Sequence, residues 1–546
     1  MTPQVDDRTV GGVLRRRVAE DGDAAFLVCD DRRLSYRELF DASTEVAKGL
    51  LAAGAVRGTH VGLLLPNSVE FAITAVAVMR IGAVAVPMST LSTVTELRSL
   101  VDHSDTTLLV AIREYRGRRF DELLAEATGL AGATEPPLRA AATPTLRRVF
   151  FHGKGDLAFG TDPGWRTETL VADGSAIADD LLASLEAGVR PADPVVIVHT
   201  SGSTSAPKGV VHAHGALLDH LAVLNDLREY GPGEVLFSNS PFFWIGGFAY
   251  TFLGTLVAGA TVLCSQEADP AKVLDMMERE RPTMCNGYAA SATALAADPT
   301  FPRRDLSSMT RGNLYALMPP AAVPSDPQLR TNMLGMTEGG SVVLTGTVVE
   351  AEHDLPEQFR GSFGRPTPDL EARIVDRATG ADCAPGEKGE LWLRGPAMML
   401  GYHGLERTRV FDGDGWFHTG DLVHRDEHDH WYFHGRADDM IKTSGANVSP
   451  AEVQQAVLAA TGLGSIVFGV PDPAKGQVVA AVLLLEDGEV AAPDTDELRE
   501  RLGPMLSSYK IPRVVRTVPA TEVPLKSSGK VDLAALKELV AGSGPV

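Results

Sequence analysis

Residues 195–211 read VVIVHTSGSTSAPKGVV and join an apolar run to a loop of small, hydroxylated residues. Val195 to Val198 have the length and β-branched composition of a buried strand. The ten residues from Thr200 to Gly209 then supply five hydroxyls, two glycines and one lysine. Such a composition suits phosphate, because glycine lets backbone N–H groups approach, hydroxyls donate hydrogen bonds and lysine supplies positive charge. The loop is therefore predicted to bind phosphate.

Two other interpretations of this loop are weaker. A flexible Ser/Gly linker has a similar composition, but linkers seldom lie between a strand and a second apolar run such as Val210–Val211. A P-loop requires the pattern G-x-x-x-x-G-K-[ST], whereas Lys208 follows a proline and precedes a glycine. A P-loop NTPase is therefore a poor fit.

Helix and strand signals alternate upstream of the loop. Ser35 and Glu38 form a capping-box pattern that predicts a helix ending near Gly54. Further predicted helices begin after Ser68 and near Thr95, and predicted strands cover residues 60–65, 83–86 and 106–110. This alternation is typical of βαβ units in a parallel sheet with helices on both faces.

The pattern changes in the carboxy-terminal part. Residues 361–400 contain short apolar runs separated by Pro-Gly and Gly-Pro turns, as in β hairpins. After Gly435-Arg436 a compact tail follows, with helix signals at 450–460 and the chain end and strand signals at 466–470 and 478–485. We predict an α/β fold: a large N-terminal domain (1–435) of parallel α/β sheets plus a β subdomain, and a small, mobile α+β C-terminal domain (436–546).

Composition limits the possible partners. The 546 residues are 44% hydrophobic and 22% charged, as in ordinary globular proteins. Fifty basic against 71 acidic residues give a net charge of −21, which disfavours binding to nucleic acid. Residues 242–266 lack charged side chains, but their four glycines and acidic flanks favour a buried loop, helix and strand over a membrane span. Four scattered cysteines and a polar amino terminus predict free thiols in the cytoplasm.

Four later segments accompany the phosphate loop in a recognisable order. They are GMTE at 335–338, WFHTGD at 416–421, GRADD at 435–439 and SGK at 528–530. Together with the loop they resemble the motifs of the AMP-forming adenylate synthetases, a superfamily of acyl-CoA synthetases, peptide-synthetase adenylation domains and firefly-type luciferases. The resemblance spans nearly the whole chain. Each motif alone is weak, but five in register are specific.

The resemblance implies an ATP site and an enzyme activity, that of an acyl-CoA synthetase. The carboxylate of a small-molecule acid would attack the α-phosphate of ATP, and coenzyme A would then displace AMP to give a thioester. Glu338 would bind Mg²⁺, Asp421 the ribose, and Lys530 would bridge carboxylate and α-phosphate. The implied catalytic residues are Lys530, Thr337 and Glu338; the implied ATP-binding residues are Thr200, Ser201, Gly202, Ser203, Thr204, Lys208, Gly335, Met336, Thr337, Asp421, Arg436 and Lys530.

The resemblance also implies domain alternation between the two half-reactions. The small domain would swing about a hinge at Asp438, so that Lys530 leaves and a second face arrives to admit the thiol. The implied coenzyme A residues are Lys442, Ser444 and Gly445.

An apolar segment predicts the acid pocket. Aromatic residues and glycines alternate around residues 242–248, and two further glycines follow Glu338. Such a pocket suits an apolar and bulky acid, and no acidic residue is present there to bind an amino group. The predicted pocket residues are Phe243, Trp244, Gly246, Gly247 and Gly339, with Phe242, Phe248 and Gly340 nearby.

Departures from the family pattern leave alternatives open. Ser205 replaces a glycine, Leu334 an aromatic residue and Leu533 a basic residue, and residues 315–320 lack the Gly-Gly-Ala-Pro motif. The alternatives are an adenylating enzyme that loads a separate carrier protein, and a weakened homologue that binds nucleotide or acyl-CoA. A homodimer is also open. Four histidines between residues 424 and 434 are expected on an exposed face and not in a metal site.

Overall fold

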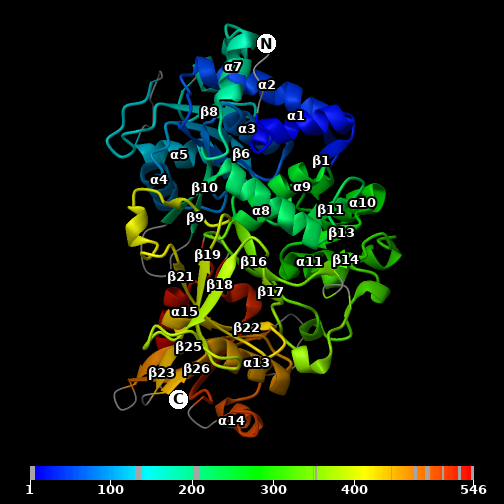
Figure 1. Cartoon of the computed structure of the whole chain (residues 1–546), viewed down its shortest axis with the longest axis vertical. Coiled ribbons are helices and arrows are strands. Elements are labelled where there is room, and N and C mark those ends of the chain that lie inside the picture. Colours follow the sequence, from blue (N-terminus) through cyan, green and yellow to red (C-terminus); the bar gives the residue numbers. More distant parts are fainter. Residues whose placement is uncertain are drawn as a thin grey trace. The chain divides into compact units, whose positions relative to one another are not determined.

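The computed structural model describes residues 6–129, 137–160, 162–200, 208–348, 350, 353–443, 446–472, 476–485, 492–506, 510–526 and 530–542 (Figure 1). Contacts divide the chain into two compact units. The first unit comprises Met1–Glu371 with Arg394–Gly415, and the second comprises Ala372–Leu393 with Trp416–Val546. The predicted boundary after Gly435 marks the start of the domain that is expected to move. It stays a prediction.

The predicted βαβ units form one sheet of the first unit. Its strand order is β20-β10-β9-β4-β3-β5-β8. From β9 to β8 neighbouring strands pair in parallel, whereas β10 runs antiparallel to both β9 and β20. The strands are β3 (His60–Leu64), β4 (Val84–Pro87), β5 (Leu108–Ile112), β8 (Arg148–His152), β9 (Pro194–Thr200), β10 (Lys208–Ala213) and β20 (Gly401–Tyr402).

A second sheet of the first unit has the order β14-β13-β11-β12-β1-β2. All its pairings are parallel except that of β1 with β2. Its strands are β1 (Ala25–Cys29), β2 (Arg32–Ser35), β11 (Val235–Ser238), β12 (Thr261–Cys264), β13 (Met284–Asn286) and β14 (Arg311–Gly312). Shorter pieces are the hairpin of β6 (Glu114–Tyr115) and β7 (Arg118–Arg119) and the sheet of β15 (Leu334–Met336), β16 (Ser341–Thr345) and β17 (Arg365–Pro366).

Helices cover these sheets, and two of them begin at the predicted caps. Ser35 and Glu38 form a complete capping box at the start of α2, and Ser68 caps α3 by accepting the Phe71 N–H. The helices of this unit are α1 (Val10–Asp21), α2 (Tyr36–Ala52), α3 (Val69–Arg80), α4 (Val94–His103), α5 (Phe120–Thr128), α6 (Thr167–Gly174), α7 (Asp179–Gly188), α8 (His214–Leu227), α9 (Gly254–Ala258), α10 (Pro270–Glu280) and α11 (Ala289–Ala296). In Figure 1 α8 runs beside α9, which it contacts.

The uncharged segment 242–266 forms the buried loop, helix and strand that its glycines predict. A π-helix covers Gly246–Leu253, α9 continues it to Ala258, and β12 follows. Phe248, Phe252 and Leu256 are fully buried. Within the described residues no helix is both long and apolar enough to cross a membrane.

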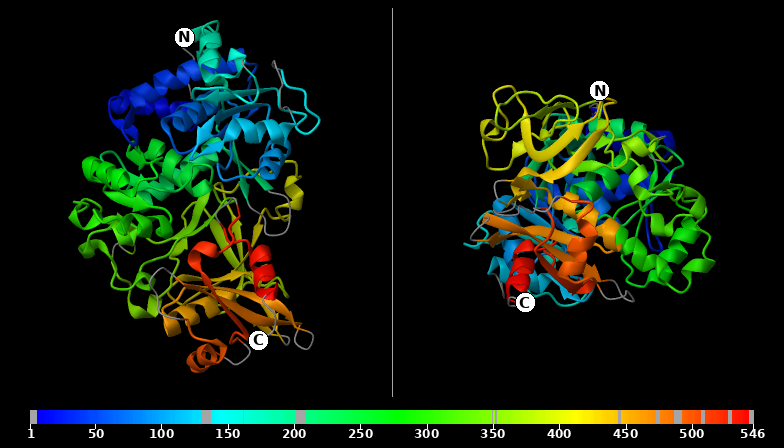
Figure 2. Two further views of the ribbon diagram at one scale, coloured as in Figure 1. Left: turned by 180° about the vertical axis from the view of Figure 1, so that it is seen from behind. Right: turned by 90° about the horizontal axis from the view of Figure 1, so that it is seen from below.

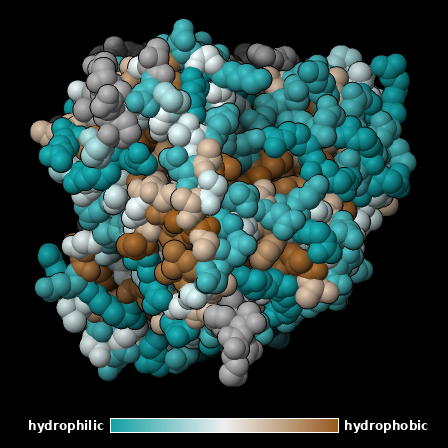
Figure 3. Space-filling view, turned by 90° about the horizontal axis from the view of Figure 1, so that it is seen from above, coloured by the Kyte–Doolittle hydropathy of each residue, from teal (hydrophilic) through white to brown (hydrophobic). Residues whose placement is uncertain are grey.

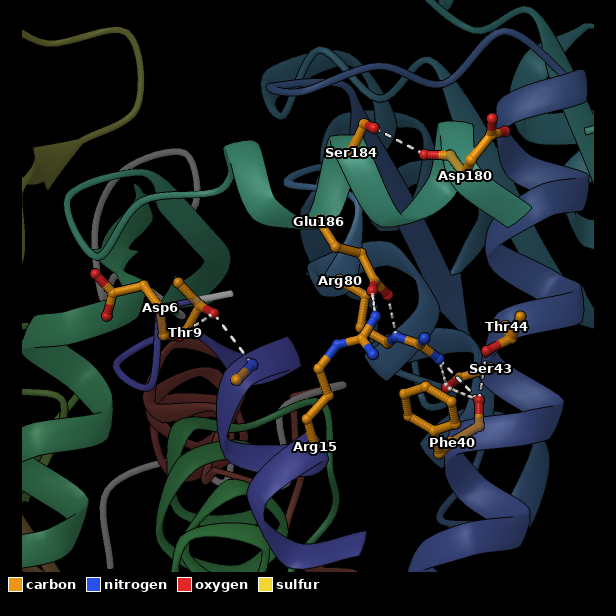
Figure 4. A network of polar contacts seen from close by, with 11 residues as sticks. Asp6, Thr9, Arg15, Phe40, Ser43, Thr44, Arg80, Asp180, Ser184 and Glu186 are labelled. Atoms are coloured by element: carbon orange, nitrogen blue, oxygen red, sulfur yellow. Dashed lines mark hydrogen bonds and ion pairs between the residues drawn. The ribbon is translucent and has the colours of Figure 1, made fainter. Parts of the chain in front are cut away.

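A buried ion-pair network joins four helices of the first unit (Figure 4). The Arg80 side chain on α3 donates to Glu186 Oε1 on α7 at 2.6 Å and to Ser43 Oγ on α2 at 2.6 Å. Arg15 on α1 forms a second ion pair with Glu186, and the Arg80 guanidinium lies 4.3 Å from the centre of the Phe40 ring. Burial lowers the pKa of Arg80, while the Glu186 carboxylate opposes this shift. The charges are therefore paired where water cannot solvate them.

The second unit contains two sheets (Figure 2). One has the order β18-β19-β21-β22, and in the other β24, β23, β26 and β25 pair in that order, with β27 beside β26. The strands are β18 (Glu371–Val375, which starts at the last residue of the first unit), β19 (Gly389–Arg394), β21 (Phe417–Arg425), β22 (Trp431–Arg436), β23 (Ile441–Thr443), β24 (Ala446–Val448), β25 (Ser465–Asp472), β26 (Gly476–Leu485) and β27 (Val514–Pro519). The helices are α13 (Pro450–Thr461), α14 (Thr495–Leu502) and α15 (Leu533–Gly542).

Strand alternation in β25 and β26 builds two cores in this unit. Val467 and Val479 pack in one core with residues of α13 and α14. Phe468 and Ala480 pack in the other with Leu536 of α15. Both strands are therefore apolar at successive positions because both faces of their sheet are covered.

The surface mixes polar and apolar residues. Seen from above, hydrophilic residues surround several groups of hydrophobic ones (Figure 3). Single exposed apolar side chains, such as Val56 and Leu181, are normal on protein surfaces and indicate no function.

Candidate active site

A lysine and a carboxylate meet around one tyrosine in the first unit. Lys208 begins β10, directly after the predicted phosphate loop, and its Nζ lies 5.0 Å from the centre of the Tyr402 ring. The Tyr402 hydroxyl donates to Glu338 Oε1 at 2.7 Å. Lys208 itself pairs with Thr200 across β10 and β9. The ends of the predicted loop and the predicted metal ligand are thus brought together.

Backbone pairing positions Tyr402 in this cluster. β20 pairs antiparallel with β10, so that Tyr402 lies opposite Val210. The Met399 N–H donates to the Glu338 carbonyl at 2.9 Å, which ties the same segment to the turn that carries Glu338. The sequence analysis did not predict Tyr402 as a site residue. It reaches this cluster only because β20 pairs with a strand almost two hundred residues earlier in the chain.

The turn of the GMTE motif is held by a buried histidine. His212 Nε2 donates to the Thr337 carbonyl at 2.7 Å, and the Gly340 N–H donates to the same oxygen at 3.1 Å. Burial lowers the pKa of His212 to about 4, so the ring is neutral at pH 7. A hydrogen bond from Nε2 leaves the proton on that nitrogen. His212 therefore orients Thr337 and is not a candidate acid or base.

Two other histidines near the loop are also neutral. Burial lowers the pKa of both His199 and His214 to about 4. His214 Nδ1 accepts the Val10 N–H at 3.2 Å, which fixes its tautomer. Among the described residues, neither ring nitrogen of His199 has a hydrogen-bond partner.

Asp421 and Arg436 form a second cluster, within the second unit. They are directly opposite each other on β21 and β22, and Arg436 Nη1 lies 3.4 Å from Asp421 Oδ1. Arg436 Nη2 also donates to the Thr419 carbonyl at 3.0 Å. Asp421 is 5% exposed, whereas about half of the Arg436 side chain is accessible. The carboxylate is therefore fixed and the guanidinium is available to a ligand.

Gly420 shapes the turn that presents Asp421. Its φ of +74° is in the left-handed region, and its N–H donates to Glu390 Oε1 at 2.9 Å. A Cβ here would lie 2.9 Å from Arg436 Nη2. The Thr-Gly-Asp motif thus needs glycine both for backbone conformation and for the position of the arginine.

The predicted pocket residues differ in what they contact. Trp244 lies edge-on to Phe243 and to Tyr288, with ring centres 5.2 Å apart in each pair. A Cβ added at Gly246 would meet no atom within 4 Å. A Cβ at Gly247 would lie 1.9 Å from the Pro241 carbonyl oxygen. Gly246 therefore borders open space, whereas Gly247 is required by close backbone packing.

Gly339, Phe242 and Phe248 are closely surrounded by protein atoms. A Cβ at Gly339 would lie 2.2 Å from Val343 Cγ1. Phe242 and Phe248, which were expected near the pocket, have side chains that are fully buried in the main core. The Phe242 ring packs on Phe71 at 5.3 Å. Their hydrophobicity contributes to folding and not to the pocket.

Several predicted residues cannot be placed fully. Ser201, Gly202, Ser203, Thr204, Ser444 and Gly445 lie outside the described residues. For Asp438 and Lys442 only the backbone is described. Lys530 is exposed, and its carbonyl accepts the Lys526 N–H at 2.8 Å.

The histidines between residues 424 and 434 are more buried than expected. His430 is 4% exposed, and His424 Nδ1 lies 2.7 Å from His434 Nε2 within a stack that includes Tyr432. Burial lowers the pKa of His434 to about 4. The exposed-face expectation is wrong for the buried His430 and for His424 and His434, which stack on each other, whereas His428 is exposed as expected. In the described part of the chain no group of three or more ligating side chains could hold a metal ion.

A model of the AMP-binding enzyme family matches residues 14–403, and a model of the AMP-binding enzyme C-terminal domain matches residues 452–530. The chain belongs to the AMP-binding enzyme family. Membership confirms the resemblance drawn from the five motifs.

Relatives of this AMP-binding enzyme include CoA ligases. A (7a-methyl-1,5-dioxo-octahydro-1H-inden-4-yl)propanoyl:CoA ligase of Mycobacterium tuberculosis is 30% identical over 549 residues, covering 98% of this chain and 99% of its own. A feruloyl-CoA synthase of Amycolatopsis is 31% identical over 508 residues, covering 91% and 92%. Among solved structures, ATP-bound MatB from Rhodopseudomonas palustris is 25% identical with a TM-score of 0.77, covering 97% of this chain and 99% of its own.

The fold of this AMP-binding enzyme is that of adenylate-forming enzymes. The anthranilate CoA ligase AuaEII has a TM-score of 0.79 at 22% identity, with 97% of each chain covered. The predicted α/β class with a large and a small domain is confirmed, as is the predicted class of AMP-forming ligase. ATP, Mg²⁺ and coenzyme A are the cofactors of such ligases.

The side chains of the two clusters are chemically suited to Mg²⁺, phosphate and ribose. Glu338 offers a half-buried carboxylate, the oxygen ligand that Mg²⁺ prefers. Lys208 offers an exposed ammonium group at the end of a Ser/Thr/Gly loop, which suits phosphate. Asp421 offers a carboxylate beside the Arg436 guanidinium, and its own N–H donates to Thr419 Oγ1; such a carboxylate suits a pair of ribose hydroxyls.

Proposed function

We propose that this protein is an acyl-CoA synthetase that activates an apolar, bulky carboxylic acid with ATP and transfers it to coenzyme A. The Lys208–Tyr402–Glu338 cluster carries this proposal. It joins the end of a phosphate-loop motif to a carboxylate metal ligand in a chain of the AMP-binding family. The charged groups needed for adenylation are present despite the departures at Leu334 and Leu533.

In the first half-reaction, the residues of the first unit bind the phosphates. Lys208 and the loop hydroxyls compensate phosphate charge, and Thr337 donates its hydroxyl to phosphate. Glu338 holds Mg²⁺, whose chemistry is to neutralise charge on the phosphates. Tyr402 orients the Glu338 carboxylate by its 2.7 Å hydrogen bond, which leaves the second carboxylate oxygen for the metal.

The residues of the second unit bind the ribose and the reacting carboxylate. Asp421 accepts hydrogen bonds from the ribose hydroxyls, and the accessible face of Arg436 lies beside ribose and phosphate. Lys530 compensates the two anions that must approach each other, the substrate carboxylate and the α-phosphate. The acid's oxygen then attacks the α-phosphorus and pyrophosphate leaves.

In the second half-reaction a different face of the small domain is used. We propose that residues 436–546 swing about Asp438, which removes Lys530 and brings Lys442, Ser444 and Gly445 to the thiol. The thiol of coenzyme A attacks the acyl carbon and AMP leaves. Motion is required because one lysine position cannot serve both steps.

The acid is apolar in this proposal because of the surroundings of Trp244. Trp244, Phe243 and Tyr288 form an aromatic wall, and Gly246 borders open space. The names of two relatives specify acids that are aromatic or bicyclic, feruloyl and octahydroindenyl propanoyl. We therefore propose an aromatic or polycyclic acid. The free cysteines suit a reducing compartment, the cytoplasm.

Mass spectrometry tests the proposal. The purified protein is incubated with ATP, Mg²⁺, coenzyme A and a panel of fatty, aromatic and polycyclic acids, with a control that lacks coenzyme A. The expected products are AMP and the acyl-CoA of an aromatic or polycyclic acid, and acyl-AMP in the control. Acyl-AMP without thioester in the full mixture would favour a carrier protein as acceptor, and the absence of both products would contradict the proposed activity.

A further inference from the structure

The fold brings together two cysteines that the sequence separates by more than two hundred residues. Cys29 ends β1 and Cys264 ends β12, and the two residues are directly paired in the parallel ladder. Directly paired residues on neighbouring strands lie about 4.8 Å apart and point to the same face. Disulfides join Cα atoms that are about 4.4–6.8 Å apart. The backbone separation is therefore already that of a disulfide.

The two paired thiols also lie in one buried environment. A hydrogen bond to Cys29 and burial raise the pKa of the Cys264 thiol well above its ordinary value. Both side chains belong to the same core cluster and are at most 3% exposed. The other two cysteines have no such partner among the described residues: Cys285 is on β13, with β11 between it and β12, and Cys383 is in the second unit.

We propose that Cys29 and Cys264 form an oxidisable dithiol site, which a small peroxide converts to an intramolecular disulfide. This proposal does not depend on the proposed ligase function.

The chemistry balances with the peroxide as oxidant. The Cys29 sulfur attacks one peroxide oxygen and the O–O bond breaks. This step converts Cys29 to a sulfenic acid and releases one water. The Cys264 sulfur then attacks the Cys29 sulfur and displaces the second water. The two thiols lose two hydrogen atoms in total and the peroxide is reduced to two waters.

One neighbour favours Cys29 as the first thiol to react, and two oppose it. The Gln266 amide donates to Cys29 Sγ at 3.8 Å, which stabilises negative charge on that sulfur. Asp30 Oδ2 at 3.8 Å and the Asn67 carbonyl oxygen at 3.7 Å both lie where they accept the thiol proton, which stabilises the unreactive thiol. The reaction is therefore expected to be slow and to need excess peroxide.

The resulting bond is expected to be easily reduced. Neighbouring strands lie about 4.7–4.9 Å apart, whereas a relaxed disulfide places its two Cβ atoms about 3.8 Å apart. Closing the bond must pull β1 and β12 together, and strained disulfides are the labile ones.

A peptide map of the whole protein tests the proposal. Reduced native protein is treated with excess hydrogen peroxide, quenched with catalase, alkylated in denaturant and digested without reductant. The expected result is a peptide that links Cys29 to Cys264, with Cys285 and Cys383 alkylated. Brief treatment with dithiothreitol should return both thiols.

Two variants sharpen the test. Cys264→Ser should abolish the cross-link and leave Cys29 as a sulfenic acid that dimedone traps, while Cys285→Ser should retain the cross-link. Sulfoxide at the exposed Met333 and Met505 serves as evidence that the oxidant acted. The proposal is overturned if both cysteines remain alkylated when these methionines are oxidised, or if the cross-link appears only after unfolding.

Discussion

At the scale of single residues, Tyr402 is the contact that orients Glu338, the proposed Mg²⁺ ligand. Replacing it by phenylalanine removes one hydroxyl and leaves the ring beside Lys208. Loss of one hydrogen bond costs about 1 kcal/mol, so Tyr402→Phe should raise the Mg²⁺ concentration for half-maximal pyrophosphate release by roughly fivefold. The matched control is Tyr432→Phe, whose hydroxyl donates to Asp426 at 3.1 Å. Equal Mg²⁺ dependence in both variants and the wild type would remove Tyr402 from the metal site.

The buried histidines predict a loss of stability in acid. Burial lowers the pKa of His214 from about 6.5 to about 4 in the folded state. Between these values the unfolded chain binds a proton that the native chain does not, so stability falls as pH decreases. From pH 8 to pH 5 this amounts to about 2 kcal/mol for one histidine. His214→Asn should therefore lose less Tm than the wild type over that interval.

The control for this prediction is an exposed histidine. His103→Asn should show the same drop in Tm between pH 8 and pH 5 as the wild type, since His103 is on the surface of α4. If His214→Asn and His103→Asn respond identically to pH, the buried ring does not carry the acid sensitivity.

At the scale of elements, the β21–β22 hairpin presents Asp421 and Arg436 through the conformation of Gly420. Gly420→Ala imposes a positive φ on a side chain, at about 1–2 kcal/mol, and also pushes on Arg436. Gly380→Ala is the matched control, because Gly380 has a φ of +72° and a Cβ there would meet nothing within 4 Å. Both variants should lose similar Tm, but only Gly420→Ala should raise the KM for ATP. A rise in both would attribute the effect to stability alone.

Local signals predicted the elements well. Ser35 with Glu38, and Ser68 before an apolar face, act through hydrogen bonds within four residues, so helix starts at α2 and α3 are readable from the sequence. Contacts made by pairing distant strands are not readable in this way. Tyr402 beside Lys208 and Cys29 beside Cys264 both depend on such pairing.

Aromatic residues were the main source of error at this scale. Phe242 and Trp244 are two residues apart in one apolar segment, yet Phe242 is buried against Phe71 while Trp244 is half-buried against Tyr288. Composition gives the hydrophobicity of such a segment but not which side chain its turn directs into the core. Two groupings of motif residues are present in the structure, Glu338 near Lys208 through Tyr402 and Asp421 beside Arg436, and their roles stay predictions.

At the scale of the whole molecule, the Arg80–Glu186 network places paired charges inside the first unit. It joins α1, α2, α3 and α7, and both of its central side chains are at most 2% exposed (Figure 4). Glu186→Gln would leave Arg80 and Arg15 without their counter-charge. The expected loss of unfolding free energy is about 3–5 kcal/mol, measured by urea denaturation.

An exposed ion pair on the same helix is the control for this prediction. Asp179 on α7 pairs with Lys48, and its side chain is 89% exposed. Asp179→Asn should change stability by less than about 1 kcal/mol. Similar losses in the two variants would contradict the importance of the buried network.

In the proposed mechanism Lys530 serves adenylation and not thioester formation. Replacing it should therefore separate the two half-reactions. The most direct test measures both half-reactions in Lys530→Ala, with Lys526→Ala as the control for a neighbouring, half-buried lysine. We predict that Lys530→Ala loses adenylate formation from acid and ATP by several orders of magnitude but still forms acyl-CoA from supplied acyl-AMP, while Lys526→Ala retains both. Equal loss of the two half-reactions, or full adenylation without Lys530, would contradict the mechanism.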